Sequence, residues 1–349
     1  MNKRWKNRPP GSNWGEFGPD DQRGRMNLVT REKVLQGIAE VKEGITFCCS
    51  LPLDYPGGQV LNPRRAPPRL AATSREGKQF FARPLADFNE NMTDVICDDQ
   101  VLMALQYSTQ WDSFAHVGSR FDADGDGKAE LVFYNGFRAG EHIVPAAENQ
   151  KSEPWARFEG TQAKALGIQG LAEHGAQGRG VLIDLHHHFG RKRHAVGFDD
   201  LMKILEIDNV KIEKGDMVCL YTGFADVLLE MQKKPDPKLV NETCTGLQGR
   251  DPRLLQWISD SGLACILADN YAVELIATSI TEPLPKTQPW LPLHEHCLFK
   301  NGIHLGELFY FSELARWLRE HKRSRFLFTA PPLRLPGAVG SPATPIATV

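Results

Sequence analysis

The sequence predicts a mixed α/β protein. In its second half, short apolar runs alternate with segments that carry a helical pattern. These runs are short enough to be buried strands, and they cover residues 181–185, 217–222, 263–268 and 325–329. No internal repeat or domain-sized linker interrupts the pattern, so residues 1–349 are expected to form a single domain.

The first third of the chain predicts one helix, one strand and a long loop. Residues 1–13 are basic and are expected to form a loose N-terminal arm. Thr30 is a good N-cap for a helix over residues 31–43, and residues 45–51 read as a strand. Residues 52–70 are rich in Pro, Gly and Arg and predict a surface loop, with a lid over a binding site as the alternative.

The remaining elements follow from periodicity and from breaker residues. An apolar run at residues 101–105 predicts a buried strand or a turn of helix. Proline-rich residues 281–293 predict a loop. Helices are expected over residues 156–172, 198–205, 254–261, 294–300 and 312–322, and after Gly223.

Composition excludes several classes of function. The chain is 41% hydrophobic and 24% charged, as expected of a globular protein, and its formal net charge of −2 gives no reason to expect nucleic acid or an anionic membrane as partner. No apolar run approaches the length of a membrane span, and the basic N-terminus lacks the apolar core of a secretory signal. Seven cysteines without a C-x-x-C spacing fit reduced thiols and a cytoplasmic location.

A cluster of polar side chains at residues 106–116 is the strongest chemical signal. In an extended strand, alternate residues face the same way, so Gln106, Gln110, Asp112 and His116 would share one face. Two amide oxygens, a carboxylate and an imidazole make half of a metal site, or a metal ligand beside a general base. The alternative is a hydrogen-bonded polar network without a metal.

A second cluster lies near the C-terminus and contains His294, Glu295, His296, His304 and Glu307. We expect the fold to bring the two clusters together.

Two other polar groups are expected to stay outside the site. Asp122, Asp124 and Asp126 match the start of a calcium loop, but Phe133 stands where that loop needs a bidentate Glu, so a polar turn is expected, with a loose calcium site left open. His186, His187 and His188 follow a predicted strand, on which at most two of them can converge, and we expect a polar rim beside the site.

These residues resemble the putative cyclase family, which includes bacterial kynurenine formamidase and isatin hydrolase. The resemblance covers most of the chain. It is carried by Trp14-Gly15, residues 20–28, Thr109-Gln-Trp-Asp112, residues 178–184, Asp269-Asn270 with Glu274, residues 302–307 and the closing residues 329–342. It implies a swivelling β/β/α fold with a barrel-like mixed sheet and peripheral helices, and a homo-oligomer.

The better-known members carry His-x-Gly-Thr-His-x-Asp-x-Pro-x-His, in which the first two histidines and the aspartate bind metal and the last histidine is a base. Here Gln106 and Gln110 replace the two metal-binding histidines, Asp112 and His116 are retained, and Phe114 replaces the proline. The chain therefore resembles a longer Thr-Gln-Trp-Asp branch. The replacement favours one metal over two.

The resemblance implies a metal-dependent hydrolase. The expected ligands are Gln110, Asp112, His294 and Glu307, with Glu295 or His296 as alternatives to His294 because the spacing is one residue longer than in the formamidases. This mixed oxygen and nitrogen set suits Zn²⁺ or Mn²⁺, and His116 is the expected base. Trp111, Phe114 and Tyr134 are expected to form a wall for a flat ring, or else simply core, and Gln106 is expected to contact the substrate.

The expected substrates are compact amides, lactams or lactones. A lactone-specific enzyme of the dienelactone hydrolase type and a dehydratase-like activity are the alternatives within metal enzymes. A small-ligand-binding relative that has lost its metal is the non-catalytic alternative.

Overall fold

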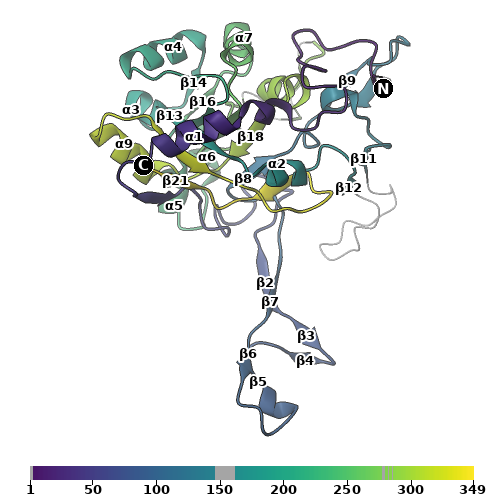
Figure 1. Ribbon diagram of the computed structural model, residues 1–349, viewed down its shortest axis with the longest axis vertical. Helices are drawn as coiled ribbons and strands as arrows, with labels where there is room; N and C mark the ends of the chain where they lie inside the picture. The colour runs from purple at the N-terminus through teal and green to yellow at the C-terminus, as the bar shows by residue number, and fades with distance from the viewer. Residues whose placement is uncertain (1–2, 146–161, 277–279, 282, 285) are drawn as a thin grey trace.

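A curled sheet of nine strands runs through the centre of the protein (Figure 1). The computed structural model describes residues 3–145, 162–276, 280–281, 283–284 and 286–349. The strands lie in the order β1 (Thr46–Cys48), β21 (Ile346–Thr348), β19 (Arg325–Thr329), β13 (Gln177–Asp184), β15 (Met217–Tyr221), β17 (Cys265–Ala268), β18 (His304–Glu307), β8 (Gln110–Asp112) and β20 (Gly340–Pro342). The four from β13 to β18 are parallel, and the strands on both sides of them pair antiparallel. The expected barrel-like mixed sheet with peripheral helices is confirmed.

The central strands carry apolar residues on both faces because helices cover both faces of the sheet. In β13, Val181 and Ile183 belong to the core of one face and Leu182 to the core of the other. This explains why these strands read as short continuous apolar runs. The strands predicted over residues 217–222, 263–268 and 325–329 are confirmed within two residues, and the strand predicted over residues 181–185 is confirmed but begins four residues earlier, at Gln177.

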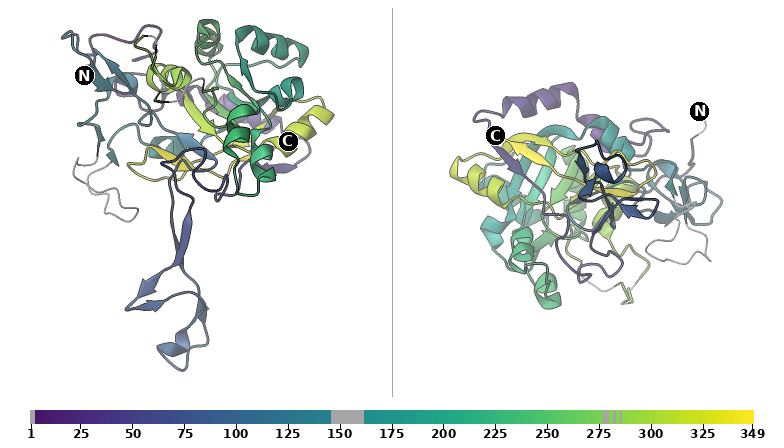
Figure 2. Two further views of the ribbon diagram at one scale, coloured as in Figure 1. Left: turned by 180° about the vertical axis from the view of Figure 1, so that it is seen from behind. Right: turned by 90° about the horizontal axis from the view of Figure 1, so that it is seen from below.

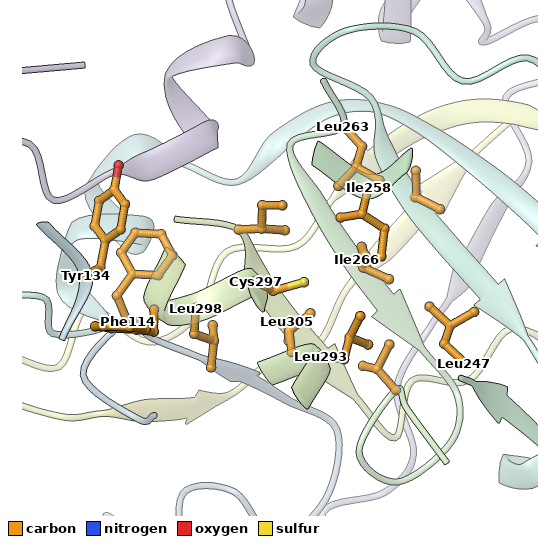
Figure 3. Close-up of a cluster of buried hydrophobic side chains, with 14 of the residues drawn as sticks. Phe114, Tyr134, Leu247, Ile258, Leu263, Ile266, Leu293, Cys297, Leu298 and Leu305 are labelled. Carbon is orange, nitrogen blue, oxygen red and sulfur yellow. The ribbon is translucent and has the colours of Figure 1, made fainter. Parts of the chain in front are cut away.

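One face of the sheet packs against four helical segments, and Figure 3 draws part of this core. Leu201, Ile258, Leu293 and Cys297 come from the helices, and Leu305 comes from β18. The helical segments are α4 (Phe198–Ile207), α7 (Pro252–Ser261), α8 (Pro292–His294) and the π-helical turn η4 (Glu295–Lys300). Two of them, α8 and η4, carry the second polar cluster over the sheet.

The opposite face is covered by α1 (Arg31–Ala39), α2 (Gln169–His174) and α9 (Ser312–Glu320). Thr30 caps α1 as predicted, because its Oγ1 accepts from the backbone N of Lys33 at 3.4 Å. A Cβ at Gly37 would lie 2.8 Å from the carbonyl oxygen of Gly178, so only glycine lets α1 approach β13 this closely. The helix predicted over residues 156–172 lies partly outside the described residues, and it is wrong for residues 162–168, which form a short strand and a turn before α2 begins at Gln169.

Smaller elements complete the body. After the sheet strands come α3 (Leu185–Phe189), α5 (Phe224–Glu230) and α6 (Pro237–Glu242), and β14 (His194–Val196) pairs in parallel with β16 (Thr245–Leu247). Near the N-terminus lie η1 (Gly24–Leu28), η3 (Tyr134–Gly136), the β9 (Ser119–Phe121) and β10 (Glu130–Val132) hairpin, and the pair β11 (Ile143–Val144) and β12 (Gln162–Ala163).

The N-terminal residues pack onto this region. Trp5 is buried against Trp14, with ring centroids 5.7 Å apart, and Lys6 donates its backbone N–H to Ala123. The expected loose arm is therefore wrong for residues 3–13, because a buried indole anchors them.

A long hairpin arm, which no sequence pattern indicated, projects away from the body (Figures 1 and 2). Its base is the antiparallel pair β2 and β7, and it exposes Leu70, Phe81 and Val95, which are 60–75% accessible. Val101 is exposed and residues 102–105 are only partly buried, so the expected burial of residues 101–105 is wrong. The arm comprises β2 (Arg69–Ala72), β3 (Ser74–Arg75), β4 (Lys78–Gln79), β5 (Arg83–Pro84), η2 (Leu85–Asp87), β6 (Val95–Ile96) and β7 (Asp99–Leu102).

All seven cysteines are free thiols, in agreement with the expected reduced state. Among the described residues, no helix has the length and hydrophobicity to cross a bilayer.

Candidate metal centre

The two polar clusters meet because β8 and β18 are neighbours in the sheet. In their antiparallel register, Asp112 lies opposite Leu305 and Gln110 lies opposite Glu307. Glu307 is the last residue of β18, so the site lies at the carboxyl end of the parallel strands, where α/β folds bind their ligands. The predicted convergence of the two clusters is confirmed.

Three buried side chains converge there: Asp112, His294 and Glu307. One ligand atom from each lies within 4.8 Å of the other two, and each residue is at most 3% exposed. His294 Nε2 lies 3.2 Å from Glu307 Oε1 and 3.9 Å from Asp112 Oδ2. Two carboxylates and an imidazole in one buried place match a site for a divalent cation.

The Asp112 carboxylate gives the structural test of that fit. Both of its oxygens are buried, and neither has a hydrogen-bond partner among the described residues. Burial raises the pKa of Asp112, and the positive charge of a nearby histidine only partly opposes this. An unpartnered buried carboxylate is costly, whereas a bound cation would satisfy both oxygens, so these residues fit a metal.

Glu274 holds His294 in place from behind. Its Oε1 accepts from His294 Nδ1 at 2.8 Å and from the His294 backbone N–H at 3.1 Å. A Cβ at Gly249 would lie 2.1 Å from Glu274 Oε2, so glycine is required for this carboxylate to approach. Such a carboxylate–histidine pair fixes the ring and directs Nε2 at a metal.

Charge reinforces this arrangement. Burial acts to lower the pKa of His294, but its hydrogen bonds with Glu274 and Glu307 outweigh burial and raise the pKa to about 10. Burial acts to raise the pKa of Glu307, and the hydrogen bond from His294 brings it below its ordinary value. The Nε2 proton of His294 therefore lies where a cation would replace it.

Gln110 orients Glu307. Its Nε2 donates to Glu307 Oε2 at 3.0 Å, and its own Oε1 is buried without a partner among the described residues. This hydrogen bond fixes which end of the amide faces Glu307. Gln110 thus fixes the position of the Glu307 carboxylate through its amide nitrogen, and its amide oxygen stays without a partner among the described residues.

His116 lies at the rim of the cluster. A turn after β8, closed by the hydrogen bond from His116 N to Ser113 O, brings its Nε2 to 3.8 Å from Asp112 Oδ1. Burial lowers the pKa of His116, and the negative charge of Asp112 opposes this. A neutral imidazole beside the metal ligands can accept a proton.

The alternative ligands have other partners. Glu295 accepts from Ser119 and pairs with Lys300, and His296 contacts Ser259 Oγ at 3.0 Å. His304 bonds the backbone oxygen of Asp112 through Nδ1 at 2.9 Å. Of the histidines in the second cluster, His294 alone joins the group, which agrees with the choice made from the resemblance.

The predicted aromatic wall does not line the site. Trp111 points to the opposite face of the sheet and donates its Nε1–H to Ala330 O at 2.7 Å. Phe114 packs against Tyr134 (Figure 3) and stacks on His304. All three predicted rings are fully buried in the cores. The three rings therefore belong to the core, which was the second of the two roles expected for them.

The three consecutive histidines also differ from expectation. β13 ends at Asp184 and α3 begins at Leu185, so the three histidines lie on a helix. The expectation that alternate residues of a strand share a face does not apply to them. His188 bonds Asp208 at 2.8 Å and His186 packs against Tyr221.

The aspartate-rich turn is flanked by β9 and β10, as expected of a polar turn, and its carboxylates accept from backbone N–H groups.

The loop before the arm closes one side of the centre. Arg65 donates to the backbone oxygen of Gln106 at 2.7 Å, and Asn62 donates to the Tyr271 hydroxyl at 3.4 Å. These four residues line a small depression, and Asn62 and Tyr271 also line a larger cavity of about 640 Å³. The charge of Arg65 acts to lower the pKa of both Asp112 and Glu307, so this part of the loop lies near the centre, and a lid over it stays a prediction.

Sequence reasoning named Glu274 only as part of a motif and did not name Tyr271. Both follow the end of β17 within six residues, beside Asp269-Asn270. Polar residues after a buried parallel strand were the available signal for both.

Comparisons with known proteins agree with this geometry. A profile of the family described as putative cyclase matches residues 50–275. A solved structure described as a novel cyclase is 27% identical, with a TM-score of 0.72, and the match covers 98% of this chain and 100% of that one. No curated protein matches the chain.

Isatin hydrolases share the fold at lower identity. Isatin hydrolase A from Labrenzia aggregata is 12% identical with a TM-score of 0.53, covering 90% of this chain and 97% of that one. Isatin hydrolase A from Ralstonia solanacearum is 13% identical with a TM-score of 0.53, covering 91% and 97%.

Proposed function

The chain belongs to the putative cyclase family, and from this premise and the buried Asp112, His294 and Glu307 group we propose that it is a metal-dependent hydrolase. The reaction is the opening of a small cyclic amide or lactone, or the cleavage of an N-acyl or N-formyl amide. The fold shared with isatin hydrolases supports this class. The single observation that carries the proposal is the buried, unpartnered carboxylate of Asp112 beside two further ligand groups.

The centre would hold one Zn²⁺ or Mn²⁺ through Asp112, His294 and Glu307, with the free oxygen of Gln110 as a further donor. When bound, the cation lowers the pKa of a water molecule and polarises the substrate carbonyl. Glu274 keeps His294 oriented, and Gln110 keeps Glu307 oriented. The protein's contribution is therefore a rigid, buried set of ligands.

His116 is the proposed general base. It takes a proton from the attacking water while the new C–O bond forms, and it returns that proton to the departing nitrogen or oxygen as the C–N or C–O bond breaks. Arg65 places a positive charge at the lid, where negative charge develops on the carbonyl oxygen.

The test begins with metal content by inductively coupled plasma mass spectrometry on protein purified without chelator or affinity metal. We expect about one Zn or Mn per chain, which Asp112→Ala loses. A panel of matched amides and lactones then identifies the bond. A protein that neither holds nor gains metal, and that Zn²⁺ and Mn²⁺ do not stabilise, would instead be a small-ligand-binding relative.

A further inference from the structure

The large cavity beside the metal centre is lined by apolar side chains on one side and by two arginines on the other. Phe224, Val240 and Leu275 give it an apolar side, whereas Arg64 and Arg193 stand at its rim. Glu274, which holds His294, lines the same cavity. The space is large enough for a small aromatic or aliphatic molecule that reaches the metal centre.

Arg64 and Arg193 each have guanidinium N–H groups for which the described residues supply no acceptor. Arg64 contacts only Asn62 Oδ1, through Nε at 3.4 Å, and Arg193 donates to the backbone oxygens of Asn241 and Ile276. Within the described part of the chain, neither arginine lies within ion-pair distance of a carboxylate. Guanidinium groups with no carboxylate partner of their own are suited to binding an anion.

The floor of the cavity carries a second sign of a polar ligand. Asn270 Oδ1 and Thr245 Oγ1 are buried and have no hydrogen-bond partner among the described residues, and both residues line the cavity. Asn270 Nδ2 donates to the carbonyl oxygens of Thr245 and Val273, so its free atom is the amide oxygen. Buried polar atoms normally have a hydrogen-bond partner, and a polar ligand in the cavity can supply one.

Charge balance favours a negative ligand. Asp112, Glu307 and Glu274 carry three negative charges, of which a divalent cation balances two. Arg64, Arg65 and Arg193 then outnumber the remaining negative charge. The entrance therefore has a positive surplus that attracts anions.

We propose that the substrate is a small organic acid whose carboxylate is bound by Arg64 and Arg193 while its apolar body lies along Phe224 and Val240. The hydrolysed carbonyl lies at the other end of the molecule, towards the metal centre. The reaction of this acid rests on the proposed function, whereas its binding does not.

The experiment compares benzoate with benzamide, a neutral molecule of the same shape, by isothermal titration calorimetry on the metal-loaded full chain. We expect benzoate to bind at least about tenfold more tightly, as one charge-assisted hydrogen bond provides. Arg64→Gln and Arg193→Gln should each weaken benzoate about tenfold and leave benzamide unchanged. Arg69→Gln, on the arm outside the cavity, is the matched control and should change neither.

Equal affinity for the two probes would overturn the proposal. So would unchanged benzoate binding in both arginine variants, because the cation itself would then be the anion's partner. Metal content is measured on every sample. If the wild type holds no metal, the proposed function fails, and the same titrations on that protein still decide whether the cavity binds acids.

Discussion

Replacing Asp112 by Asn should have opposite effects on stability with and without a metal. The substitution keeps the shape of the side chain and removes the charge of a fully buried carboxylate that has no hydrogen-bond partner. It also removes repulsion from Glu307, whose oxygen lies within 4.8 Å, and attraction to His294, whose Nε2 lies 3.9 Å from Asp112 Oδ2. The amide of the variant stays buried and polar but carries no charge, and burial of a charge costs more than burial of a neutral polar group, so the metal-free variant should be more stable by about 1–3 kcal/mol.

Melting temperature makes this measurable. With an unfolding entropy of roughly 2 cal/mol/K per residue, a chain of 349 residues should melt about 1–4 °C higher after the substitution. With Zn²⁺ or Mn²⁺ at about a thousand times its dissociation constant, the wild type gains about 4 kcal/mol, or about 6 °C, and the variant gains little. The order of the two proteins should therefore reverse when metal replaces chelator.

Differential scanning calorimetry in chelator and in added metal gives both values. Asp98→Asn is the control, because it removes the same charge from an exposed position on the arm and should leave both melting temperatures unchanged. A metal-free Asp112→Asn protein that melts below the wild type would refute the reasoning, since the carboxylate would then have a stabilising partner. Equal stabilisation of both proteins by metal would refute it as well.

Three further outcomes are expected. His116→Gln should keep its metal and lose roughly a hundredfold or more in turnover, and metal loss by mass spectrometry would instead place the imidazole among the ligands. Glu274→Gln should weaken cation binding roughly 10- to 100-fold in competition with a chelating dye, and unchanged affinity would show that His294 needs no support. Replacing residues 70–101 with a short Gly-Ser linker should leave metal content unchanged, and light scattering should report a smaller species if the expected homo-oligomer forms through the exposed arm.

Much of the sheet and the residues of the candidate metal centre could be predicted from sequence. Strands buried on both faces need continuous apolar runs, so their positions stand out in the sequence. Asp112, His294 and Glu307 are chemically distinctive and lie at strand or helix ends, where the fold gathers polar groups. The register of β8 against β18 then brings them together, and no single segment of sequence contains that register.

The rest depended on local geometry that residue types do not reveal. The shared face predicted for residues 106–116 holds only within β8, and His116 reaches the site through a turn instead of along a strand. Trp111 lies between two site residues, yet strand alternation sends its ring to the other face. The arm strands are exposed on both sides, so they lack the alternation that reveals a half-buried strand.

One hydrogen bond lies between the base of the arm and the metal centre. Arg65 precedes the first arm strand and Gln106 follows the last one. The hydrogen bond between them joins the two segments of the chain where the arm leaves the body. Four residues beyond Gln106 the chain enters β8 and its ligand face. Displacement of the arm therefore acts on the Arg65–Gln106 bond, and with it on the entrance to the centre. If arm displacement changes the affinity of the centre for its ligand, the ligand must in turn change the affinity of the arm for any partner that binds it, by the same factor.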